Sequence, residues 1–114
     1  MDTSFGIVGK DYVLVATDAV AGRSIMIYTK DEDKSIAVNN TTLMAMTGPQ
    51  GDRMNFGEYI RSNVALNELR AGHTLSTKAI ANFTREQLAE ALRSNPKQVR
   101  HTVHAHNKTL IKQL

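Results

Sequence analysis

The sequence contains no cysteine and no tryptophan, and only two prolines fall among its 114 residues. Without cysteine the chain forms no disulfide and offers no thiolate to zinc or an iron–sulfur cluster, which is usual in a reducing compartment. No apolar run approaches the roughly 20 residues that a membrane-spanning helix needs. No basic and then apolar segment opens the chain, so we expect no secretory signal. These absences favour one domain, or part of one, in the cytoplasm or nucleus, without membrane binding.

Acidic residues are missing from the last eighteen positions. Residues 97–114 carry four Lys or Arg and no Asp or Glu, whereas residues 1–96 carry ten basic and eleven acidic residues. Because the excess basic charge is confined to one end, it does not predict that the folded part of the chain binds nucleic acid. The tail itself holds no aromatic ring that could stack on a base. It could contact phosphate or an acidic surface, but a solvated, poorly ordered terminus is the commoner state. Its order after Val99 stays open.

Short apolar runs separated by turn residues fill the first part of the chain and predict β-strands. The predicted strands are residues 5–8, 12–17, 24–29, 35–38 and 43–46. Their hairpin-length connections favour an antiparallel sheet. The second run is continuously apolar over five residues, as expected for a strand that is covered on both faces.

Residues 50–94 read as two amphipathic helices. The predicted apolar stripes are Phe56, Tyr59, Ile60, Val64 and Leu69 in the first helix, and Ile80, Phe83, Leu88, Ala91 and Leu92 in the second. Gly72 is a good C-cap for the first helix, and Ser76 can cap the second. Strands followed by helices predict an α+β fold with the helices on one face of the sheet. The other face would need cover from more chain or from partner subunits.

Three positions could carry chemistry. Asp18 ends an apolar strand and Lys34 opens another, and such a pair can tune a nucleophile where strand ends converge. By spacing alone, both are more often simple turn charges. Gly48 lies in the strand-to-helix turn 47–52, where backbone N–H groups could stabilise an oxyanion, although a plain turn is the simpler interpretation. The turn is not a P-loop, because it lacks the Gly-Lys-Ser/Thr ending.

Three histidines, His101, His104 and His106, lie within six residues of the tail. Neither a strand nor a helix gathers all three on one face, and no carboxylate is near in sequence. They are weak candidates for a metal site, and we expect neither a structural metal nor a cofactor.

The order and spacing of these segments resemble the N-terminal half of a proteasome beta subunit, and within that family the beta type-2 branch. The likeness covers residues 1 to about 99. It is carried by residues 5–18, 33–34, 43–60 and 86–94. It implies the N-terminal-nucleophile hydrolase fold, a four-layer α/β/β/α sandwich, truncated here to about five antiparallel strands and two helices. Residues 1–99 would be the first half of the domain and residues 100–114 a divergent basic tail, as a frame change, alternative splice or gene-model error would produce.

The resemblance also implies a site. Active family members use an N-terminal threonine together with an Asp, a Lys and a Gly N–H, which correspond here to Asp18, Lys34 and Gly48. The nucleophile position falls on Asp2, which has no hydroxyl. Thr3 is one residue further along a strand, so its side chain would turn to the opposite face.

We therefore expect a non-catalytic, structural subunit of the 20S core particle. Its partners would be alpha and beta subunits of the barrel, in the cytoplasm and nucleus, with a role in ubiquitin-dependent and other intracellular protein degradation. Two alternatives remain: a threonine-type endopeptidase that uses Thr3 after trimming, and an anion-binding or assembly-modulating fragment that acts through its tail.

Overall fold

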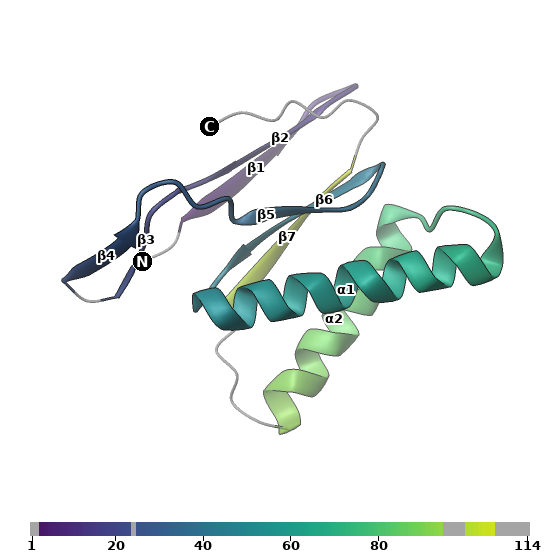
Figure 1. Ribbon diagram of the computed structural model, residues 1–114. Helices are drawn as coiled ribbons and strands as arrows, with labels where there is room; N and C mark the ends of the chain where they lie inside the picture. Colours follow the sequence, from purple (N-terminus) through teal and green to yellow (C-terminus); the bar gives the residue numbers. More distant parts are fainter. Residues whose placement is uncertain (1–2, 24, 95–99, 107–114) are drawn as a thin grey trace.

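The computed structural model describes residues 3–23, 25–94 and 100–106, with the backbone alone for residues 23, 92, 94 and 100–106. These residues form seven strands and two helices (Figure 1). The elements are β1 (Ser4–Val8), β2 (Val13–Thr17), β3 (Ala21–Arg23), β4 (Met26–Thr29), β5 (Ser35–Asn39), β6 (Thr42–Thr47), α1 (Gln50–Ala71), α2 (Thr77–Ser94) and β7 (Arg100–His106). All strand pairs are antiparallel, so the α+β organisation is confirmed.

The strands form three hydrogen-bonded groups, β1–β2, β3–β4 and β5–β6–β7, where one sheet of about five strands was expected. The predicted strand 24–29 is shorter and folds back on β3, which the sequence pattern missed. At Gly22 a Cβ atom would lie only 2.6 Å from the Met26 carbonyl oxygen, so this hairpin depends on glycine. β3 was missed because its three residues, with glycine in the centre, are too few to show the alternation of apolar and polar residues that predicts a strand.

The beginning of the tail is a strand. Residues 100–106 pair with β6 along its whole length, from Thr47 opposite Arg100 to Thr42 opposite His106. The expectation of a poorly ordered terminus is therefore wrong for residues 100–106, while residues 107–114 lie outside the described part of the chain. β6 becomes the central strand of its group.

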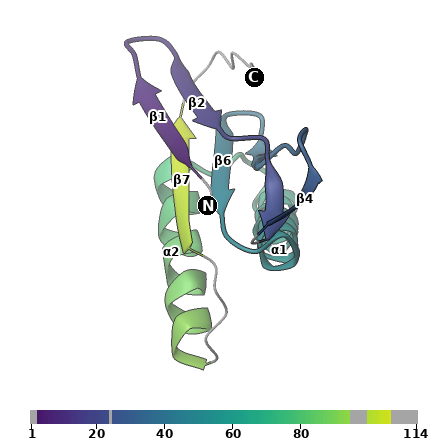
Figure 2. The same cartoon turned by 90° about the vertical axis from the view of Figure 1, so that its left-hand side faces the viewer.

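The two helices cover one side of the β5–β6–β7 group (Figures 1 and 2). The core between these layers consists of Val38, Met44, Met46, Ile60, Val64 and Ile80. Gly57 allows the close approach of α1, because a Cβ atom there would lie 2.6 Å from the Met46 methyl carbon. The helix layer on one sheet face is as predicted.

The predicted stripe of α1 is only partly right. Ile60 and Val64 are buried, but Tyr59 and Leu69 are 49% and 82% exposed. The buried face is instead Arg53, Gly57, Ile60 and Val64.

Both predicted caps between the helices are confirmed. Gly72 adopts the left-handed conformation at φ 72°, and its amide donates to the Glu68 carbonyl. The Ser76 hydroxyl accepts a hydrogen bond from the Ala79 amide at 3.2 Å, at the start of α2.

The β1–β2 hairpin lies on the side of β5–β6–β7 away from the helices and contacts β6 and β7 (Figure 1). Phe5, Ile7 and Val8 of β1 are all more than half exposed. Apolar surface therefore remains on this side of the described structure. Neither α1 nor α2, the helices of the described residues, is apolar enough over its length to cross a membrane.

We predict that Ile60→Ala lowers the free energy of unfolding by about 2–5 kcal/mol, because the fully buried side chain leaves a cavity between α1 and the sheet. Leu69→Ala on the same helix is the matched control and should change it by less than about 0.5 kcal/mol. Urea unfolding followed by circular dichroism measures both. Equal effects of the two variants would contradict the described helix orientation.

Candidate functional site

Asp18 joins two segments of chain through its carboxylate. Oδ1 accepts a hydrogen bond from the Thr3 amide at 2.9 Å, and Oδ2 accepts one from the Lys34 ammonium at 2.9 Å. The Asp18 amide in turn donates to the Thr3 carbonyl at 3.0 Å. This pairing continues the β1–β2 ladder, in which Ser4 lies opposite Thr17. The end of β2 is thereby tied both to the start of β1 and to Lys34.

Lys34 is a buried cation whose side chain is 0% exposed. Its Nζ donates to the Val20 carbonyl at 2.8 Å as well as to Asp18, and its own carbonyl accepts from the Met46 amide at 3.0 Å. A desolvated ammonium is tolerated only when a negative charge and further acceptors surround it, and both are present here. The structure thus brings Asp18 and Lys34 together.

Gly48 lies between β6 and α1. It comes two residues after Met46, whose amide donates to the Lys34 carbonyl. Its φ of 142° lies in the region that favours glycine. Its carbonyl accepts a hydrogen bond from Arg53 Nη1 at 3.0 Å. The strand-to-helix turn is therefore fixed by a side chain from the first turn of α1.

A second buried ion pair, between Arg53 and Glu32, lies beside the first and was missed by sequence reasoning. The side chains are 4% and 11% exposed, and Arg53 Nη2 donates to Glu32 Oε1. The Glu32 amide donates to the Ala19 carbonyl at 2.9 Å. Arg53 therefore connects the loop that contains Glu32 to the turn that contains Gly48. The helical spacing of Arg53 with Gly57, Ile60 and Val64 could have indicated that it lies on the buried face of α1.

A cavity of about 210 Å³ opens next to these pairs. It is lined by Asp33, Lys34, Ser35, Ile36, Met46, Arg53, Met54, Gly57, Glu58 and Arg61. The Ser35 hydroxyl in this wall donates to the Asp33 carboxylate at 2.6 Å, within a local turn. Thr3 is exposed, and Asp2, the predicted nucleophile position, lies outside the described residues.

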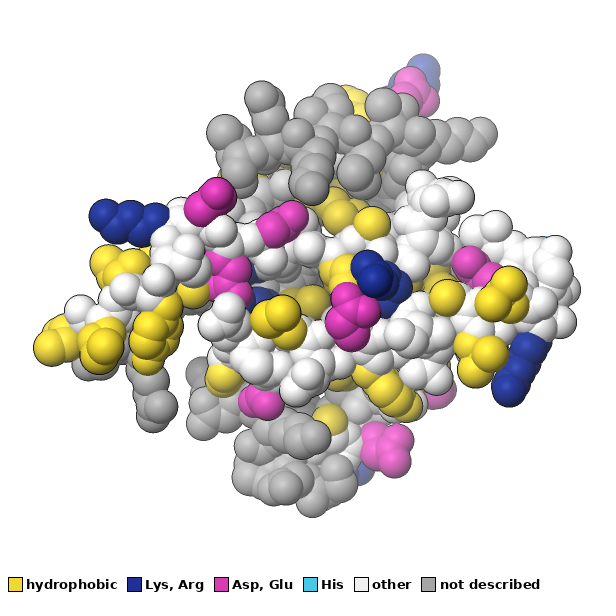
Figure 3. All heavy atoms as spheres, in the orientation of Figure 1, with side chains coloured by type: hydrophobic (Ala, Val, Ile, Leu, Met, Phe, Trp, Pro, Cys, Tyr) yellow, Lys and Arg dark blue, Asp and Glu magenta, His cyan; other side chains and the backbone are white. Residues whose placement is uncertain are grey.

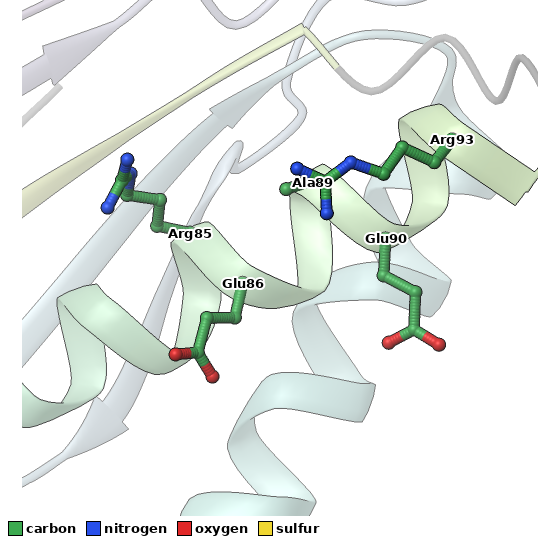
Figure 4. A pocket seen from close by; sticks show the side chains of 5 residues that line it. All are labelled: Arg85, Glu86, Ala89, Glu90 and Arg93. Atoms are coloured by element: carbon green, nitrogen blue, oxygen red, sulfur yellow. The ribbon is translucent and has the colours of Figure 1, made fainter.

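A larger hollow runs along the outer side of α2 and is lined by Arg85, Glu86, Ala89, Glu90 and Arg93 (Figure 4). Its two arginines and two glutamates balance in charge, as on an ordinary solvated helix face. It offers no nucleophile.

Within the described residues, no three His, Asp or Glu side chains are grouped to hold a metal ion. The backbone of His101, His104 and His106 lies in β7, but their side chains are outside the description. Their weak metal candidacy stays untested.

A family model described as proteasome subunit matches residues 1–109. The chain is 46% identical to proteasome subunit beta type-2-B of Arabidopsis thaliana over 87% of its own length and 50% of that protein. It is 45% identical to proteasome subunit beta type-2 of Oryza sativa subsp. japonica over 84% of its length and 45% of that protein. It is 44% identical to a probable proteasome subunit beta type-4 of Schizosaccharomyces pombe, over 87% and 52%. The chain spans about half the length of these curated relatives.

We predict that Asp18→Asn lowers the free energy of unfolding by about 3 kcal/mol, because it leaves the Lys34 ammonium buried beside a neutral amide. Removing one partner of a buried ion pair costs about 3–5 kcal/mol. We expect a loss at the lower end of this range because the Asp18 side chain is 29% exposed. Adding Lys34→Met to Asp18→Asn should restore much of the loss, because no unpaired charge then remains buried. Urea unfolding of both variants and of Lys34→Met completes the cycle, and additive losses would show that the two side chains act independently.

Arg53→Lys should cost about 2 kcal/mol, because an ammonium cannot reproduce the fork that binds both Glu32 and the Gly48 carbonyl. Arg61→Lys is the matched control on the same helix. Its pair with Glu58 is 50% and 55% exposed, so the change should stay below about 0.5 kcal/mol. If Arg53→Lys left the free energy of unfolding unchanged in the same assay, Arg53 would not act by binding both partners at once.

Proposed function

The chain belongs to the proteasome subunit family, and we propose that it is a non-catalytic, structural beta-type subunit of the 20S core particle. The observation that carries this proposal is the Asp18 carboxylate, which binds a backbone amide and the Lys34 ammonium at 2.9 Å each. The site is arranged as a scaffold in which each charge has a structural partner. Asp2, at the position that the resemblance gives to the nucleophile, has no hydroxyl with which to attack a peptide bond.

Thr3 is a poor substitute for the missing nucleophile. Its amide donates to Asp18 and its carbonyl accepts from Asp18, so its backbone is held as part of the β1–β2 ladder. The residue is exposed, whereas the Lys34 side chain is fully buried. Use of the Thr3 hydroxyl with Lys34 as its base would require the start of β1 to shift by one residue, which reverses the direction of every side chain in it.

We further propose that residues 1–99 correspond to the first half of an α/β/β/α sandwich and that residues 100–114 are a divergent tail. The first of these two proposals is supported by the relatives, which are about twice as long, and by the exposed apolar residues of β1. The remaining cover would come from further chain or from neighbouring alpha and beta subunits in the barrel. The chain would act within the core particle in the cytoplasm and nucleus. Its role would be in intracellular protein degradation, including ubiquitin-dependent degradation.

The test is to isolate the core particle through an epitope tag on another subunit and to determine the intact mass of this chain in it. We expect a species that retains Met1 and Asp2, and we expect Thr3→Ala to leave peptide hydrolysis by the particle unchanged. A reagent that labels N-terminal threonine nucleophiles should modify active subunits, which serve as the internal control, but not this chain.

An intact mass that corresponds to a chain starting at Thr3, together with labelling of this chain by the reagent, would overturn the structural role. The chain would then be a threonine-type endopeptidase. Absence from the particle, with binding to anionic surfaces that is lost at high salt, would favour an anion-binding fragment acting through the tail.

A further inference from the structure

β1 is paired along one edge only. Within the described residues it forms a two-stranded group with β2, and no strand is hydrogen-bonded along its other edge. Phe5, Ile7 and Val8 are 55%, 51% and 77% exposed. Gly6 is exposed as well, and because it has no side chain, this exposed surface is backbone. The open edge of β1 therefore presents peptide groups and apolar side chains together.

The hydrogen bonds of the β1–β2 hairpin show which peptide groups point outward. Thr3, just before β1, accepts a hydrogen bond from the chain opposite at 3.0 Å, and Gly9, just after it, donates one at 2.8 Å. In an antiparallel pair, residues that bond to the opposite strand alternate with residues that do not. The N–H and C=O groups of Ser4, Gly6 and Val8 therefore point to the open edge.

The open edge lacks the features that keep edge strands from pairing with other chains. Proteins protect such edges with charged side chains, proline or β-bulges. None of the five residues of β1 is charged, and none is proline. The β1–β2 register is regular, whereas the β3–β4, β5–β6 and β6–β7 pairs each contain a shift. Figure 3 shows the contrast with α1, over which acidic and basic side chains lie among the hydrophobic ones.

The open edge is complementary to a second copy of itself. When two copies of β1 run antiparallel about a two-fold axis at Gly6, Ser4 of each copy lies opposite Val8 of the other. All three outward-pointing residues of each copy then exchange hydrogen bonds, and any other antiparallel register pairs fewer of them. Phe5 of each copy lies opposite Ile7 of the other, and such aromatic and β-branched pairs stabilise antiparallel strands. No charges oppose each other across this axis.

We propose that β1 pairs with β1 of a second copy of this chain, in the antiparallel register centred on Gly6. Each copy offers the same surface to the other, as in other two-fold dimers. This dimer is a state of the chain outside the core particle, so the inference goes beyond the proposed structural role and does not depend on it.

The absence of cysteine allows the register to be tested with single thiols. Residues opposite each other at a non-hydrogen-bonded position have Cα atoms about 4.5 Å apart, which suits a disulfide, whereas diagonal neighbours lie about 7–8 Å apart. Under mild oxidation, a mixture of the Phe5→Cys and Ile7→Cys chains should form a disulfide-linked dimer at least about ten times faster than either variant alone. Non-reducing electrophoresis and intact mass measure the product.

The control mixes Ile7→Cys with Leu69→Cys, at an exposed apolar residue of α1. Its cross-linking should be no faster than that of the single variants. Equal rates in all mixtures would overturn the proposed register, since the links would then arise from random collision.

Sedimentation velocity of the unmodified chain is an independent measurement that does not rely on the variants. We expect a reversible, concentration-dependent dimer, and association should stop there because pairing occupies the open edge of both copies. A chain that stays monomeric would leave this edge to a different partner and would overturn the proposal, as would a chain that forms only larger assemblies. Either failure leaves the proposed role in the core particle standing.

Discussion

The burial of the Lys34 ammonium is the constraint on which the rest of the structure depends. A cation that is fully removed from water requires an anion within hydrogen-bond distance, and Asp18 provides it at 2.9 Å. Asp18 lies directly after β2 and also binds the Thr3 amide, while Lys34 lies directly before β5. One carboxylate therefore holds the β1–β2 hairpin against the three-stranded group. The alignment of these strand ends follows from electrostatics as much as from apolar packing.

The neighbouring pair of Arg53 and Glu32 gives the polar centre a structural role of its own. Arg53 reaches from α1 to the Gly48 carbonyl and to the turn that precedes Lys34, so the two pairs share the same loops. Removal of one member of a buried pair leaves an unpaired charge, which costs more than the pair contributes. The centre therefore depends on each of its own charged members. The presence of Asp18, Lys34 and Gly48 is consequently compatible with a purely structural subunit.

Local signals predicted most of the fold. Gly72 ends α1 and Ser76 caps the start of α2 by their own backbone and side-chain chemistry, so the sequence sufficed there. β7 was missed because most of its residues are polar, and it is a strand through pairing with β6. Arg53 was missed because a charged residue was not counted in an apolar stripe. The convergence of Asp18 and Lys34 was indicated by the family resemblance, since a contact across 16 residues has no local signature.

The apolar residues left exposed on β1 and β4 point to the same physical conclusion from two sides of the molecule. Phe5, Ile7 and Val8 occupy the side of the sheet without helices, and the β3–β4 hairpin occupies one end. The chain spans about half the length of its relatives, and its own described layers leave both surfaces uncovered. When a partner binds the folded state alone, folding stability rises with the partner's concentration. A partner that covers either surface would therefore raise the folding stability of this chain, in which the polar centre aligns the strands.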